Sequence, residues 1–181
     1  MRRRLYAVVA VAALGFALPS HAEAPKVLDG KKVTKLEVKS NGGNQQHDVE
    51  SAATGFGLLG SSSPYKCVAP TACLRYDFVF KPDGITGNVV FRTAWVNRQS
   101  DMDLYVYDKA GKEVAHCGAG VGVGEAVSIA GDKLVSGDKY TVIVNYYRSF
   151  GDDVTTTVEF PATLAASSYA AGSLVGQGCA Q

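Results

Sequence analysis

The sequence has little net charge, few histidines and a single tryptophan, and its main part lacks a long apolar run. Its 181 residues carry 18 Lys and Arg against 17 Asp and Glu, with three His. Because the basic residues after residue 22 are scattered, that part of the chain has no basic patch of the kind that binds nucleic acid. No segment after residue 22 is apolar for long enough to span a membrane. These absences exclude a nucleic-acid partner and predict a mature chain without a membrane span.

The N-terminus has the three parts of a secretory signal peptide. Residues 2–4 are all Arg, residues 5–18 are apolar, and Ser20 and Ala22 place small residues three and one before a cut after Ala22. A membrane anchor is the alternative, but the apolar run is shorter than a spanning helix requires. We expect residues 1–22 to be removed and the mature protein, now slightly acidic, to be secreted or periplasmic.

All four cysteines follow the predicted cleavage site. An even number of Cys in an oxidising compartment suggests two disulfides, for which three pairings are possible. We favour Cys67–Cys73 with Cys117–Cys179, because the first pair flanks a short proline-containing loop. The spacing lacks the CxxC knuckle or clustered His that zinc sites usually have, so a metal role is disfavoured.

The mature chain is rich in β-branched and aromatic residues that alternate with polar ones between Gly and Pro turns, and it shows no helical periodicity. Such spacing favours an antiparallel, jelly-roll-like β-sandwich over a fold of alternating strands and helices. Residues 23–73 form an N-terminal strand and an irregular segment, residues 74–160 the sandwich, and residues 161–181 a tail. The expected strands are 32–39, 74–81, 88–96, 101–107, 113–117, 125–130, 140–147 and 154–160.

One strand and its hairpin carry a recognisable motif. The run Asp-Met-Asp-Leu-Tyr-Val-Tyr-Asp at 101–108, followed by Gly111, resembles the signature strand of the bacterial pre-peptidase C-terminal domain. Residues 76–84 look like the first strand of that family, and residues 136–144 look like its late G-x-Y-x-V-x-V strand. The resemblance covers about residues 74–160. The four Cys and the Gly-rich stretch 118–124 are not part of the family pattern.

The resemblance implies a jelly-roll-like β-sandwich. Family members usually accompany secreted peptidases and are often removed on maturation. Some bind collagen-like or other extracellular polymers with help from calcium. For this chain the resemblance implies a non-catalytic binding or accessory module, whose partner is an extracellular polymer, a peptidase or an envelope component.

The strand at 101–107 also suggests where contact occurs. Successive side chains of a strand point to opposite faces, so its apolar residues form one face and its polar and aromatic residues the other. The second face carries Asp101, Asp103, Tyr105 and Tyr107. We predict that these four residues form the binding surface.

Three carboxylates in this region are candidate calcium ligands, since Ca²⁺ prefers carboxylate oxygens. They are Asp101, Asp103 and Asp108. The competing interpretation is local hydrogen bonding, in which Asp101 caps a turn, Asp103 bonds across the sheet and Asp108 starts the hairpin loop. The adjacent acids Asp152 and Asp153 are interpreted mainly as a solvated turn. No other cofactor is predicted.

Catalytic residues are sparse in the mature chain. It has two His, His47 and His116, and no G-x-S-x-G elbow. His116 and Cys117 are neighbours in one expected strand and therefore point to opposite faces. We predict that the protein is not an enzyme. The alternatives are a small secreted hydrolase whose His site is assembled in space, and a purely structural envelope protein.

Overall fold

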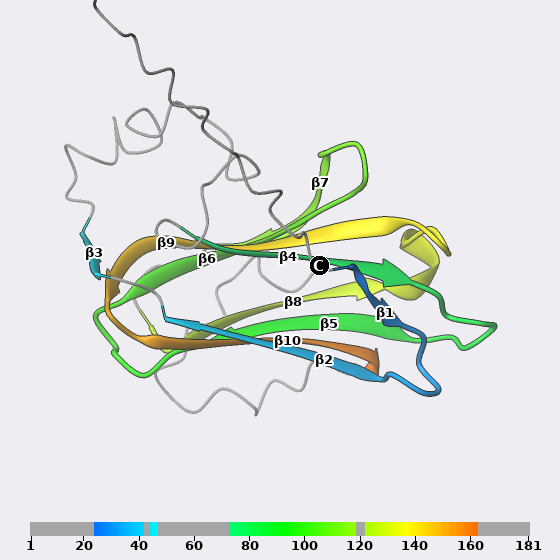
Figure 1. Ribbon diagram of the computed structural model, residues 1–181, viewed down its shortest axis with the longest axis horizontal. Helices are drawn as coiled ribbons and strands as arrows, with labels where there is room; N and C mark the ends of the chain where they lie inside the picture. The colour runs from blue at the N-terminus through cyan, green and yellow to red at the C-terminus, as the bar shows by residue number, and fades with distance from the viewer. Residues whose placement is uncertain (1–23, 42–43, 47–72, 119–121, 163–181) are drawn as a thin grey trace, which may run out of the picture.

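Two β-sheets face each other as a sandwich in the computed structural model, which describes residues 24–41, 44–46, 73–118 and 122–162 (Figure 1). One sheet has the order β1-β4-β9-β6-β7, with β3 also paired to β9, and the other has the order β2-β10-β5-β8. The expected all-β sandwich is therefore confirmed. The strands are β1 (Lys26–Leu28), β2 (Lys35–Asn41), β3 (Asn44–Gln46), β4 (Cys73–Phe80), β5 (Asn88–Ala94), β6 (Asp101–Tyr107), β7 (Glu113–Cys117), β8 (Gly124–Ala130), β9 (Lys139–Phe150) and β10 (Asp153–Ala162).

The core lies between the two sheets and follows from the alternation in the sequence. In β6, Met102, Leu104 and Val106 are fully buried and face the other sheet. Phe78 of β4 meets Phe91 of β5 across the interior, with ring centroids 5.9 Å apart. Each fully buried side chain of this size contributes about 1.5–3 kcal/mol. The inner faces of the two sheets therefore hold the sandwich together.

The first strands differ from the sequence expectation because of one carboxylate. The Oδ1 atom of Asp29 accepts backbone N–H bonds from Lys31, Lys32 and Val33, at 2.9, 2.8 and 2.9 Å. These bonds, led by the one from Val33, lower the pKa of Asp29. The resulting turn separates β1 from β2, so the strand expected at 32–39 begins only at Lys35.

Strand β1 itself was not predicted. It pairs parallel to β4, with Lys26 opposite Phe78 and Leu28 opposite Phe80, whereas the other described pairs are antiparallel. Three residues are too few to show a period of two. The predicted signal peptide, the tail beyond residue 162 and most of the segment 40–72 lie outside the described residues. No helix in the described part of the chain is long and apolar enough to cross a membrane.

Two of the four cysteines lie in described strands. Cys73 packs with Ile143 on the side of its sheet that faces away from the core, whereas Cys117 packs inside the core. Strands β9 and β6 separate their strands, β4 and β7. Three strand spacings amount to about 14 Å, and a disulfide needs Cα atoms within about 7 Å. A Cys73–Cys117 bond is therefore excluded.

We expect peptide mapping of the unreduced, exported protein to show no peptide that links Cys73 to Cys117. Cys67 and Cys179 lie outside the described residues, so the favoured pairing, Cys67–Cys73 with Cys117–Cys179, stays a prediction. Fragmentation of the disulfide-linked peptides of an unreduced digest distinguishes it from the crossed pairing. A linked Cys73–Cys117 peptide would contradict the strand order of the six-stranded sheet.

Candidate binding surface

The six-stranded sheet has a second face that points away from the core, which we call the outer face. Side chains from neighbouring strands meet there in three rows, set by the register of β4, β9, β6 and β7. The rows are Cys73, Asn145 and Asp103; Arg75, Ile143, Tyr105 and His116; and Asp77, Thr141 and Tyr107. Three of the four predicted contact residues, Asp103, Tyr105 and Tyr107, thus share one face.

The middle of the outer face is a stack of three rings. Tyr105 lies between Tyr107, with ring centroids 6.1 Å apart and planes at 18°, and His116, at 5.8 Å and 25°. Tyr107 is only 2% exposed, so it offers little surface to a partner. Its ring packs against that of Tyr105 and restricts the orientation of Tyr105. The His116 side chain is 59% exposed. Tyr105 is therefore held in one orientation beside an accessible imidazole.

Asp103 adjoins this stack and has an altered pKa. Its Oδ2 atom accepts a hydrogen bond from Asn145 Nδ2 at 3.3 Å and lies 3.5 Å from Tyr105 Oη. Burial, reinforced by the charge of Asp101, raises the pKa of Asp103 to about 6, although the contacts with Asn145 and Tyr105 act in the opposite direction. A carboxyl that titrates near neutral pH is typical of functional sites.

His116 has a partner that the sequence did not reveal. Its Nδ1 atom lies 2.7 Å from Oε1 of Glu113. Residues three apart in a regular strand point to opposite faces, but a bulge shifts the register between β6 and β7. Tyr107 pairs with Glu113 and Val106 with Ala115, which leaves Val114 as the extra residue. This bulge brings the two side chains together.

The three predicted calcium ligands do not converge. Asp108 Oδ1 accepts backbone bonds from Ala110 at 2.8 Å and Lys112 at 2.9 Å, so it forms the hairpin turn. Asp101 stands at the other end of β6, opposite Arg148, and about 23 Å of strand separates the two acids. One ion cannot be bound by all three. Among the described residues, no group of three His, Cys, Asp or Glu side chains is placed to hold a metal.

Asp101 differs in environment from Asp103, although both belong to the predicted surface. Burial raises the pKa of Asp101, and the nearby Arg148 guanidinium partly offsets this effect. A register shift between Asp101 and Met102 takes Asp101 out of the regular rows. Its charge is close enough to raise the pKa of Asp103. Asp101 therefore affects the predicted surface through the pKa of Asp103 and lies at the end of the strand, outside the rows of the outer face.

A buried acid of the other sheet also reaches this region. Glu125 of β8 is 2% exposed, and its Oε2 atom accepts the backbone N–H of Leu104 at 3.1 Å. This hydrogen bond joins the two sheets, since β8 and β6 belong to different sheets. It ties the middle of β6 to the neighbouring sheet and so helps to fix the strand that carries Asp103 and Tyr105.

Comparisons with known proteins do not identify a family. The chain matches no protein-family model, and no curated protein matches it. The resemblance of the 101–108 motif to pre-peptidase C-terminal domains therefore stays a prediction, and the geometry of the outer face is the main guide to function.

Proposed function

We propose that this protein is an exported, non-catalytic binding module that contacts an extracellular polymer through the outer face. The contact residues are Asp103, Tyr105 and His116, which we call the β6–β7 surface. The observation that supports this most strongly is the stacking of Tyr105 between Tyr107 and His116. A tyrosine that is fixed before binding loses little conformational freedom on contact, which is why such residues act as anchors.

The polar groups of the surface suit a hydroxylated or amide-containing polymer. The flat ring of Tyr105 offers apolar contact, while the Asp103 carboxyl and the exposed His116 imidazole offer hydrogen bonds. In this proposal the predicted signal peptide is cleaved after Ala22 and directs the module out of the cytoplasm. The resemblance to pre-peptidase C-terminal domains supports the same class of partner, with a peptidase or an envelope component as the other outcomes.

Removal of the Tyr105 ring should abolish most of this binding. We expect wild-type protein to be retained on one of a set of insoluble polymers, namely peptidoglycan, chitin, cellulose and fibrillar collagen. Tyr105→Ala should lower retention about tenfold or more, because a central aromatic anchor contributes about 2 kcal/mol or more. His116→Ala, which truncates an exposed side chain, should weaken binding without affecting folding.

The matched control is Val135→Ala, since Val135 is a 59% exposed apolar residue that belongs to neither β6 nor β7. It should bind like the wild type. Equal retention of the wild type, Tyr105→Ala and His116→Ala would contradict the surface. If none of the four polymers retains the wild type and the protein cross-links to a secreted protein, the polymer proposal is wrong and the partner is a protein.

A small secreted hydrolase is the second candidate, favoured by one contact. Glu113 lies 2.7 Å from Nδ1 of His116, and an acid that orients an imidazole in this way is part of hydrolytic triads. His47, the other mature histidine, lies outside the described residues. Turnover of ester and peptide substrates that is lost in His116→Asn and in Glu113→Gln would favour this second function.

A further inference from the structure

Strand β2 lies at one edge of the four-stranded sheet (Figure 1). Its neighbour β10 pairs antiparallel with it over the seven residues Lys35–Asn41, without a register shift. On its other side, the backbone of residues 35–40 has no strand partner in the described part of the chain. A regular edge of this kind is a template for a further strand. Two other edge strands have a feature that hinders such pairing, since β1 has only three residues and β7 carries the Val114 bulge.

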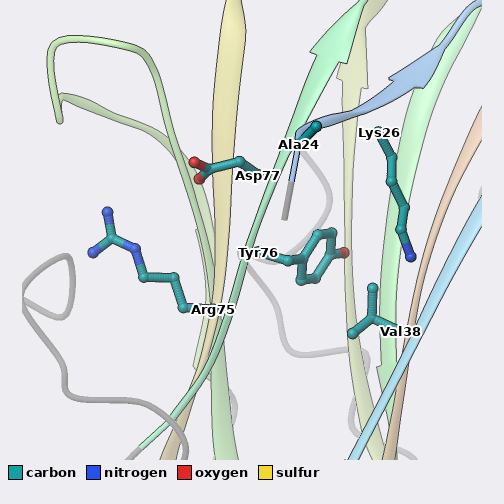
Figure 2. A pocket seen from close by; sticks show the side chains of 6 residues that line it. All are labelled: Ala24, Lys26, Val38, Arg75, Tyr76 and Asp77. Atoms are coloured by element: carbon teal, nitrogen blue, oxygen red, sulfur yellow. The ribbon is translucent and has the colours of Figure 1, made fainter. Parts of the chain in front are cut away.

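The charges on β2 alternate in sign along its outward face. The side chains of Lys35, Glu37 and Lys39 are 49%, 43% and 73% exposed. Val38 lies on the opposite face of the strand, next to Tyr76 of the other sheet (Figure 2). The Glu37 carboxylate is 3.9 Å from Nζ of Lys35 and 3.3 Å from Nζ of Lys39. Exposed ion pairs of this kind are weak, so each charge can also contact a partner molecule.

This order of charges is complementary to itself in one register. In an antiparallel pair, residues that lie directly opposite each other share a face of the sheet. When two β2 strands overlap over their full length, Val38 meets Val38 of the second copy, and each Glu37 meets a Lys39. A shift by two residues in either direction places Glu37 against Glu37 or Lys39 against Lys39. A shift by one residue turns the charged face of one strand toward the apolar face of the other.

We propose that two copies of this protein pair through β2 and form a two-fold symmetric dimer, in which the two four-stranded sheets become one continuous sheet. The interface is isologous, because each Glu37 contacts the Lys39 of the other copy. The two-fold axis is perpendicular to the sheet at Val38, so the outer faces of the two copies point in the same direction. The dimer therefore presents two β6–β7 surfaces on one side, which increases retention on a polymer with repeated sites.

Sedimentation velocity of the exported protein measures the dimer without any polymer, so the result is independent of the proposed binding function. A single pair of strands is a small interface, so we expect a dissociation constant on the order of 100 μM. Glu37→Lys and Lys39→Glu each give positions 37 and 39 the same sign, which places like charges opposite each other. Each variant should raise the dissociation constant about tenfold or more, since two cross-strand ion pairs become repulsive.

The two variants can also be combined. An equimolar mixture of Glu37→Lys and Lys39→Glu should form a heterodimer, because positions 37 and 39 are both positive in one strand and both negative in the other. The double variant Glu37→Lys/Lys39→Glu exchanges the two signs and should dimerise like the wild type. Lys133→Glu is the matched control, since Lys133 is an exposed lysine outside β2, and it should dimerise like the wild type.

Three results would each overturn the proposal. The first is a wild type that stays monomeric up to about 1 mM. The second is equal dimerisation of the wild type and both single variants. The third is a failure of both the mixture and the double variant to restore the dimer. Circular dichroism checks that the variants are folded, which we expect because they change only exposed side chains.

Discussion

Asp152→Ala is expected to lower the free energy of unfolding by about 3–5 kcal/mol, because it leaves several buried donors without acceptors. Asp152 is 8% exposed, and its Oδ1 atom accepts the backbone N–H of Asn97 at 2.8 Å. Its Oδ2 atom accepts the hydroxyl of Ser100, which is fully buried, and the backbone N–H of Phe150 at 3.4 Å. One carboxylate thus fastens the β5–β6 loop to the β9–β10 turn.

Urea unfolding measures this loss, with an unchanged m-value as the sign that only stability has changed. Asp153→Ala is the matched control, because the neighbouring acid is exposed, and its effect should stay within about 0.5 kcal/mol. Asp152→Asn should fall between the two, since an amide keeps one acceptor oxygen but places a donor toward Ser100 or Phe150. Equal stability of Asp152→Ala and Asp153→Ala would contradict the role of the buried carboxylate.

Asp103→Asn is expected to raise the free energy of unfolding at pH 7.5 by about 2–3 kcal/mol, the equivalent of a pKa difference of about two units. Burial and the charge of Asp101 raise the pKa of Asp103 to about 6 in the folded protein, against about 3.9 in an unfolded chain. The folded state therefore binds the proton more tightly. The stability that this contributes is complete below about pH 4 and is lost as the pH rises to about 6.

An amide imitates the neutral carboxyl at every pH, so the loss between pH 4 and 6 should be absent from Asp103→Asn. Unfolding curves are measured at pH 4, 5, 6 and 7.5 for the wild type and the variant. The difference between their free energies of unfolding isolates the contribution of Asp103, because the other titratable groups are present in both proteins. His116, whose charge acts on Asp103 in the opposite direction, is retained in both proteins. Parallel pH profiles for the two proteins would contradict the raised pKa.

The sequence predicted the strands best where alternation is strong and local. Strands β6 and β7 have the predicted boundaries, Asp101–Tyr107 and Glu113–Cys117, because β6 alternates over its whole length and a Gly-containing hairpin joins it to β7. The outward placement of Tyr105 and Tyr107 followed from the same alternation. The burial of Tyr107 did not, since Ile143 and Cys73, which pack with it, come from strands distant in sequence.

What the sequence could not predict depends on pairs of distant residues. Asp152 looked like a solvated turn, because its partners Asn97 and Ser100 are more than fifty positions away. The Val114 bulge is a property of the pairing of two strands rather than of either strand. A pocket lined by residues of β1, β2 and β4, among them Lys26, Val38 and Tyr76, could likewise not be predicted from any one of these strands (Figure 2).

The stability cost of Asp103 and its position beside Tyr105 together support a role for this carboxyl in binding rather than in folding. The most direct test is the affinity of Asp103→Asn at pH 7.5 for the polymer that retains the wild type, measured alongside its free energy of unfolding. We expect a variant that is more stable than the wild type and binds about tenfold more weakly, since a hydrogen bond to a charged group contributes about 1.5–3 kcal/mol. A variant that gains stability and keeps the wild-type affinity would contradict a role of Asp103 in binding.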